Sequence, residues 1–157
     1  MSHPHEEIAA IERLKYRYFR CVDTKAWEEL REVLTEDCVS WYDSGRHGFE
    51  GSEAMIAFLT DALPASIVSM HHAHHPEIEL TSDTTARGCW YLHDYVVNDG
   101  TGHPSFPDRT ELHGSALIEE EYRKVDGHWR ISRTGYERIF EDLRPLPEKH
   151  SFRSRWS

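Results

Sequence analysis

Helical periodicity in this chain is confined to the first 63 residues, and strand-like alternation dominates the remainder. Apolar residues recur at helical spacing in residues 6–24, and further helices are expected at residues 24–34 and 53–63. A strand-like segment at residues 38–45 separates the last two. Helices that precede a run of strands favour an α+β fold, in which the helices pack on one face of a curved sheet and enclose a pocket.

Local signals set the expected ends of these helices. Asp23 and Thr24 offer a break after the first helix and an N-cap for the second. Ser52 is expected to cap the third helix, which Pro64 then ends. The division into three short N-terminal helices rests on these positions.

The strand-rich part of the chain contains one strong hairpin signal. Segments at residues 112–125 and 128–140 flank the dipeptide Asp126-Gly127, which suits a turn that needs positive φ. A third strand is expected at residues 84–97. Residues 98–113 between them are rich in Gly, Pro and Asp and predict a long loop of functional interest.

Length and charge narrow the class of protein. The 157 residues fit one domain, which we place at residues 1–142, followed by a basic C-terminal arm at residues 143–157. A net charge of −10 disfavours nucleic acid and anionic membranes as partners. Without an export signal or a CxxC pair, the three cysteines are expected to be reduced, so a cytoplasmic location is predicted.

Residues 69–80, "SMHHAHHPEIEL", raise the question of a metal site because they hold four histidines. These are His71, His72, His74 and His75. Adjacent strand residues point to opposite faces, so all four cannot converge on zinc unless the chain bends. We therefore expect no metal here, and we interpret His72, His74 and His75 as pocket-rim or surface residues.

Strict alternation would also separate His71 from the core. It places His71 on the face opposite to Ile78 and Leu80. A bulge or kink between them, for which Pro76 is a candidate, is needed to turn His71 toward the pocket.

Several motifs together resemble one superfamily. The element order and "DGHWRI" in the last hairpin resemble the SnoaL-like, or nuclear-transport-factor-like, cone fold. The segments "KYRYFRCVDTKAWEEL", "SMHHAHHPEIEL", "SDTTARGCWYLHD" and "GYERIF" are similar to the bile acid 7α-dehydratases within it. They resemble scytalone dehydratases and hexachlorocyclohexane dehydrochlorinases more distantly. The loop at residues 98–113, the richer histidine cluster and the C-terminal arm depart from the bile acid pattern.

The resemblance implies roles for particular residues. It implies an Asp–His dyad of Asp23 and His71, with Tyr18 as a proton donor to a substrate oxygen. It places Tyr42 as a second pocket tyrosine. For the remaining two positions it implies that Asp94 is an acidic catalytic residue and Arg138 a substrate-binding residue.

These residue types suit elimination of water beside a carbonyl. Histidine, with an ordinary pKa of ~6.5, can take the C–H proton, and a carboxylate on its other ring nitrogen fixes the tautomer. A tyrosine hydroxyl stabilises the developing enolate. Asp94 can help the hydroxyl leave only if it is protonated, which requires burial.

The predicted function is a cofactor-independent hydro-lyase that dehydrates a hydroxylated polycyclic ketone, either steroid- or bile-acid-like or an aromatic polyketide. The resembling branch implies a homotrimer. A ketosteroid-type isomerase, a dehydrohalogenase and a non-catalytic small-molecule-binding module remain alternatives, because the same base serves the first two and this scaffold hosts many functions.

Overall fold

A computed structural model describes residues 3–100, 102 and 106–156. The described helices are α1 (Pro4–Thr24), α2 (Trp27–Val33) and α3 (Ser52–Ala62). The described strands are β1 (Leu34–Tyr42), β2 (His47–Glu50), β3 (Ile67–Leu80), β4 (Thr85–Asn98), β5 (Thr110–Val125) and β6 (His128–Pro145). They form one six-stranded sheet in the order β2-β1-β6-β5-β4-β3, antiparallel except where β1 runs parallel to β6.

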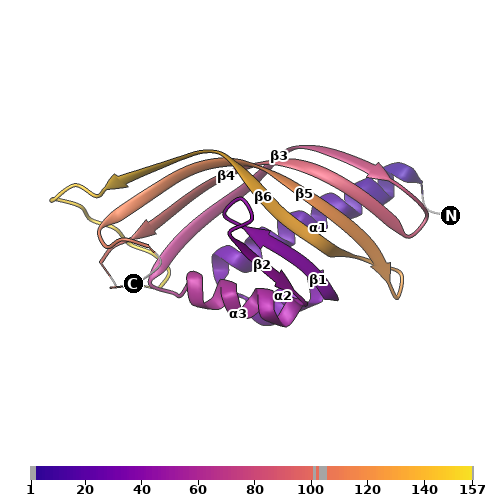
Figure 1. Ribbon diagram of the computed structural model, residues 1–157, viewed down its shortest axis with the longest axis horizontal. Helices are drawn as coiled ribbons and strands as arrows, with labels where there is room; N and C mark the ends of the chain where they lie inside the picture. The colour runs from indigo at the N-terminus through magenta and orange to yellow at the C-terminus, as the bar shows by residue number, and fades with distance from the viewer. Residues whose placement is uncertain (1–2, 101, 103–105, 157) are drawn as a thin grey trace.

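The sheet curves over the helices, which all lie on its concave side (Figure 1). This mixed, curved but open sheet with three described helices is the α+β cone that the element order predicts. Helix α1 buries Ile11, Tyr18, Phe19 and Val22 in the core, so its apolar stripe faces the sheet.

Two helix boundaries differ from expectation. Helix α1 continues through Asp23 and Thr24 and ends at Lys25, whose left-handed backbone (φ 59°) lets its N–H reach the last carbonyls. Helix α2 therefore starts at Trp27 rather than at residue 24. Ser52 is the first residue of α3, and Gly51 takes the N-cap position with φ 88°.

The strands also extend beyond the predicted segments. Strand β1 begins directly at Leu34, and β2 was not expected from the sequence. The predicted Asp126-Gly127 turn is confirmed, since these residues have φ of 50° and 78°. Strand β6 runs on to Pro145, past the residue at which the arm was expected to begin.

The connection between β4 and β5 is shorter than the predicted loop. Strand β4 ends at Asn98 and β5 begins at Thr110. The Asn98 amide donates to the Phe106 carbonyl at 2.8 Å, which ties the end of β4 to Phe106 within the connection. Residues 101 and 103–105 of the predicted loop lie outside the described residues.

A bulge in β3 resolves the problem of the histidine's direction. His74 pairs with Tyr91 and Glu77 with Cys89, so β3 contains one extra residue between these pairs. His75 in this stretch has φ 49°. The bulge lets Ala73 and Ile78 both face the core, and it brings His71 to the concave side.

Among the described residues, the helices are too short or too polar to cross a membrane.

Candidate active site

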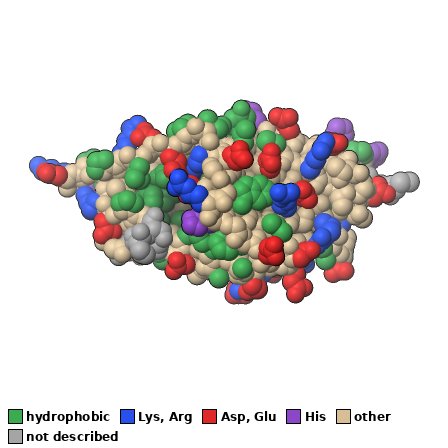
Figure 2. Space-filling view, viewed as in Figure 1, with side chains coloured by type: hydrophobic (Ala, Val, Ile, Leu, Met, Phe, Trp, Pro, Cys, Tyr) green, Lys and Arg blue, Asp and Glu red, His purple; other side chains and the backbone are tan. Residues whose placement is uncertain are grey.

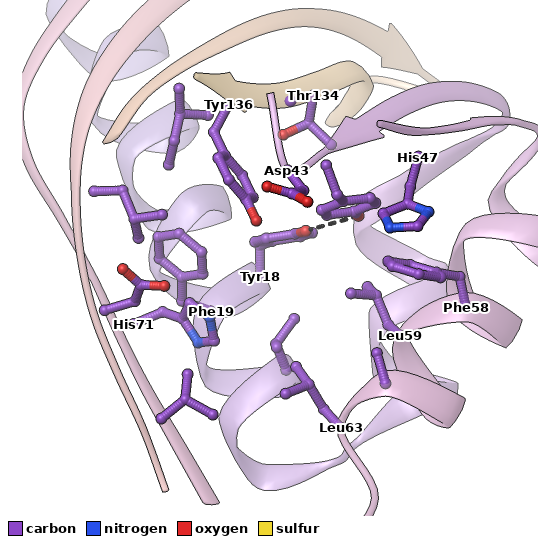
Figure 3. A pocket seen from close by; sticks show the side chains of 18 of the residues that line it. Tyr18, Phe19, Asp43, His47, Phe58, Leu59, Leu63, His71, Thr134 and Tyr136 are labelled. Atoms are coloured by element: carbon purple, nitrogen blue, oxygen red, sulfur yellow. Dashed lines mark hydrogen bonds between the residues drawn. The ribbon is translucent and has the colours of Figure 1, made fainter. Parts of the chain in front are cut away.

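A cavity of about 290 Å³ lies between the helices and the concave face of the sheet. Its lining is largely apolar and aromatic. Figure 3 shows His71 and Phe19 on one side of the cavity, and on the other Phe58 and Leu59 of α3 with Leu63, which follows that helix. Leu92 and Ile118 line it from the sheet. A mostly apolar cavity with few polar groups is typical of a small-molecule site.

Asp23 and His71 meet at the edge of this cavity. Asp23 lies in the last turn of α1, and its Oδ1 lies 2.6 Å from Nδ1 of His71 in β3. The other carboxylate oxygen accepts the backbone N–H of His71 at 2.8 Å. The imidazole stacks on Phe19, with ring centroids 5.3 Å apart and planes 16° from parallel. A carboxylate at Nδ1 favours the tautomer that leaves Nε2 free to accept a proton.

Two further side chains support the carboxylate. Ser69, which faces the same side of β3 as His71, donates its hydroxyl to Asp23 at 2.9 Å. Lys25 donates to the Ser69 hydroxyl at 3.4 Å. Burial lowers the pKa of Lys25 to about 8, and the charge of Asp23 opposes this only in part. The dyad is therefore fixed on the carboxylate side by several hydrogen bonds.

Tyr18 and Tyr42 form a buried pair beside the dyad. Their hydroxyl oxygens are 3.5 Å apart, and both residues line the cavity. Burial raises the pKa of both phenols above the ordinary value of 10, so both remain protonated near neutral pH. A protonated phenol in a cavity can donate a hydrogen bond to a substrate oxygen.

Behind Tyr18 lies an ion pair that the sequence reasoning missed. Lys15 is fully buried, and its Nζ lies 2.6 Å from Oε1 of Glu120 in β5. The ammonium is also 4.6 Å from the centroid of the Tyr18 ring. Thr134 and Tyr122 both donate hydrogen bonds to the Glu120 carboxylate at 2.6 Å. The available signal was Lys15 on the apolar stripe of the first helix, four residues after Ile11.

Asp94 and Arg138 form a second buried ion pair at the cavity wall. Two guanidinium nitrogens of Arg138 donate to the two carboxylate oxygens of Asp94 at 2.7 and 2.8 Å. Asp94 is only 3% exposed. Gly114 of β5 lies opposite Asp94, and a Cβ at that position would approach both charged groups at 2.4 Å. The absence of a side chain at Gly114 therefore makes room for the pair.

This pairing changes the role expected for Asp94. A proton donor has to be a carboxylic acid, whereas a bidentate guanidinium partner stabilises the carboxylate. Both carboxylate oxygens of Asp94 are therefore engaged with Arg138, and this contact holds Arg138 at the cavity wall. The sequence-based expectation considered the burial of Asp94 without this partner.

The structure thus gathers the predicted site residues around one cavity. His71, Tyr18, Tyr42, Asp94 and Arg138 all line it, and Asp23 contacts the imidazole of His71 directly. Sequence reasoning missed other lining residues, which include Lys15, Asp43, His47, Phe106 and Tyr136. His47 and Asp43 come from the β1–β2 hairpin, in which no strand was expected after residue 45.

Comparison with known proteins agrees with this architecture. Residues 4–135 match the family model of the SnoaL-like domain. A candidate scytalone dehydratase from Novosphingobium aromaticivorans superposes with a TM-score of 0.76 at 22% identity, over 93% of this chain and 95% of that one. A hexachlorocyclohexane dehydrochlorinase, LinA-type3 from Novosphingobium barchaimii, gives a TM-score of 0.74 at 18% identity, over 95% and 96% of the two chains.

At these identities the solved structures establish a shared fold. The finer resemblance to the bile acid 7α-dehydratases stays a prediction. The family model, in contrast, covers most of the sequence, from the start of α1 into β6. This chain belongs to the SnoaL-like domain family.

Proposed function

We propose that this protein is a cofactor-independent hydro-lyase that removes water from a hydroxylated polycyclic ketone. The observation that carries the proposal is the Asp23–His71 pair, joined at 2.6 Å, with its imidazole on the wall of a largely apolar cavity. A histidine oriented by a carboxylate is suited to abstract a proton from carbon.

In the proposed reaction, Nε2 of His71 takes the proton from the carbon next to the substrate carbonyl. Asp23 stabilises the imidazolium as it forms. The electron pair of the C–H bond moves toward the carbonyl, and the developing enolate oxygen accepts a hydrogen bond from Tyr18, which Tyr42 supports. The raised pKa of both phenols keeps these donors protonated.

The hydroxyl leaves in the second half of the reaction. As the enolate collapses, the new C=C bond forms and the C–O bond breaks, and the imidazolium of His71 returns its proton to the departing oxygen. Water is the product, and His71 is neutral again. Arg138, held by Asp94, is a cation at the cavity wall that can stabilise the departing oxygen.

The cavity also bears on the substrate class. Its volume of about 290 Å³ is just below the usual range for ligand sites, roughly 300–1,000 Å³. The aromatic and aliphatic lining matches a flat, apolar ring system. Within the proposed class, these features favour a compact polyketide-like or two- to three-ring ketone over a bile acid with its side chain.

The test is a mass-spectrometric screen of hydroxy-steroids and hydroxylated aromatic polyketide ketones with wild type, His71→Ala and His75→Asn. His75 is a matched control because it lies in the same histidine stretch but does not line the cavity. We expect loss of one water with wild type and His75→Asn, and none with His71→Ala. Unchanged mass with a shifted double bond would instead support an isomerase, and loss of hydrogen halide from halogenated rings a dehydrohalogenase. Binding without turnover would support a binding module.

A further inference from the structure

Three histidines gather on the convex face of the sheet, opposite the cavity. His72 and His74 are two residues apart in β3, so their side chains share one face. His93 of β4 is the direct cross-strand partner of His72. One potential ligand nitrogen from each of the three rings lies within 4.8 Å of the other two, and all three residues are exposed.

We propose that His72, His74 and His93 bind one divalent late transition-metal ion, such as Zn²⁺. Imidazole nitrogens are good ligands for Zn²⁺, Ni²⁺ and Cu²⁺, whereas Mg²⁺ and Ca²⁺ prefer oxygen. A tetrahedral zinc ion with Zn–N bonds of about 2.0 Å needs ligand nitrogens about 3.4 Å apart. Rotation of exposed imidazoles about their side-chain torsions can close this difference, and a water molecule would take the fourth position.

The backbone of β3 and β4 places these three histidines side by side. Directly opposed strand residues have Cβ atoms about 5 Å apart, and β3–β4 pairing is regular from Ile67 to His74. The three ligands therefore stand on a rigid two-strand platform. His75 does not belong to this set, because it sits in the bulge and packs edge-on against Tyr91 at 6.1 Å.

The position of the cluster gives it a structural consequence. His72 follows the proposed base His71 in the chain, and His93 precedes Asp94. An ion held by His72, His74 and His93 would join β3 to β4 on the outside of the same strands whose inner side carries His71 and Asp94. Metal binding is thus expected to stabilise this wall of the cavity.

The first experiment measures Zn²⁺ binding by competition with a chromophoric chelator, using protein purified without a histidine tag. We expect one ion per chain with wild type. The variants His72→Gln and His93→Gln each remove one ligand and should weaken binding by about 100-fold or more, because even indirect partners of metal ligands are worth about 10–100-fold. His75→Asn, which tolerates the positive φ of the bulge, should bind as wild type does.

The second experiment measures thermal unfolding with and without Zn²⁺. Zinc at about 100 times its dissociation constant should raise the melting temperature of wild type by about 5 °C or more. His93→Gln should unfold at the wild-type temperature in metal-free buffer and show a shift of about 1 °C or less at the same zinc concentration. Mg²⁺ should shift neither protein.

The proposal is overturned if wild type fails to bind Zn²⁺ at micromolar concentration. It is also overturned if His93→Gln binds as tightly as wild type, or if fewer than one ion binds per chain. These measurements do not depend on turnover, so they test the metal site independently of the proposed hydro-lyase activity.

Discussion

Asp23 holds His71 at two points, and this double contact fixes both the ring and the strand. One carboxylate oxygen faces Nδ1 at 2.6 Å, and the other accepts the backbone N–H at 2.8 Å. A side chain with a single acceptor oxygen cannot serve both donors. The carboxylate is therefore a positioning group whose charge and symmetry both matter for the proposed base.

The substitution Asp23→Asn tests this arrangement. With its oxygen on the backbone N–H of His71, the new amide presents an NH₂ group to Nδ1 and selects the tautomer that carries its proton on Nε2. We expect kcat to fall by about 10³- to 10⁴-fold, the size of effect seen when a histidine base is held in the wrong tautomer. The measurement is steady-state dehydration of a substrate found in the screen. A wild-type kcat in a variant with an unchanged melting temperature would refute the role of Asp23.

Lys25 makes the free energy of unfolding depend on pH. Its pKa is about 8 in the folded protein and close to 10.5 in the unfolded chain, because burial disfavours the ammonium. Between these values the unfolded state binds more protons, so the free energy of unfolding rises with pH. Below pH 8 the lysine is charged in both states and contributes no slope.

Comparison of wild type with Lys25→Met isolates this contribution. We expect the wild-type free energy of unfolding, measured in urea at several pH values from about 8 to 10.5, to increase relative to that of the variant as pH rises. Other groups that titrate in this range are common to both proteins and cancel. A difference that stays flat or falls over this range would show that Lys25 is not held at a lowered pKa.

At the scale of the element, β3 performs two tasks that a regular strand cannot combine. Its first half turns Ser69 and His71 toward Asp23, and its second half turns Ile78 and Leu80 toward the core. These two sets have opposite parity along the chain. The extra residue between His74 and Glu77 joins them.

Deletion of His75 should therefore disrupt one of the two sets. If the first half keeps its pairing, Ile78 and Leu80 turn outward, and we expect a loss of about 2 kcal/mol or more in the free energy of unfolding. If the second half keeps its pairing, His71 turns outward and its contact with Asp23 is lost. Urea denaturation together with substrate turnover distinguishes the two cases. His75→Asn keeps the chain length and should leave both unchanged, and a deletion variant that matches it in both would refute the role of the bulge.

The sequence predicted these elements unevenly, for physical reasons. Long periodic segments and the Asp126-Gly127 turn carry their signal locally, and they were placed correctly. The start of β1 at Leu34 was missed, because an apolar residue at the end of a helical pattern is equally suited to a strand that pairs with distant β6. The alternation of residues in β3 predicted a bulge near Pro76, and the pairing of β3 with β4 confirms it.

In the candidate site, too, the features that depend on local sequence were predicted, and those that depend on distant pairing were not. His71, Tyr18 and Arg138 lie in motifs that a resemblance can identify one at a time. The pairing of Asp94 with Arg138 and of Lys15 with Glu120 joins elements far apart in the chain. Such contacts depend on sheet register, which alternation patterns do not specify across strands. The partner of Asp94 could therefore not be predicted from the sequence.

At the scale of the whole molecule, the helices cover only the concave face of the sheet (Figure 1). The net charge is −10, yet Figure 2 shows acidic and basic side chains interspersed on the viewed face with hydrophobic ones between them. Several large apolar side chains on the strands are exposed. Leu117 of β5 and Phe140 of β6 are 38% and 52% exposed. Phe140 pairs with Ser115, two residues from Leu117 along β5, so these two apolar side chains lie near each other, and exposed apolar patches are typical of interfaces.

We predict that the protein is a homotrimer in which this apolar part of the sheet contacts another copy. Sedimentation equilibrium at about 10 μM should then give a mass three times that of the 18.4 kDa chain. The double substitution Leu117→Lys and Phe140→Lys places charges on the proposed contact, and burial of unpaired charge is costly, so the variant should sediment as a monomer. Tyr16→Lys is the matched control, because Tyr16 is a large exposed residue, 53% accessible, on helix α1 instead of the sheet. A wild-type mass equal to one chain, or a double variant that still forms trimers, would exclude this contact, whereas dissociation of the Tyr16→Lys protein would shift the interface to the helical side.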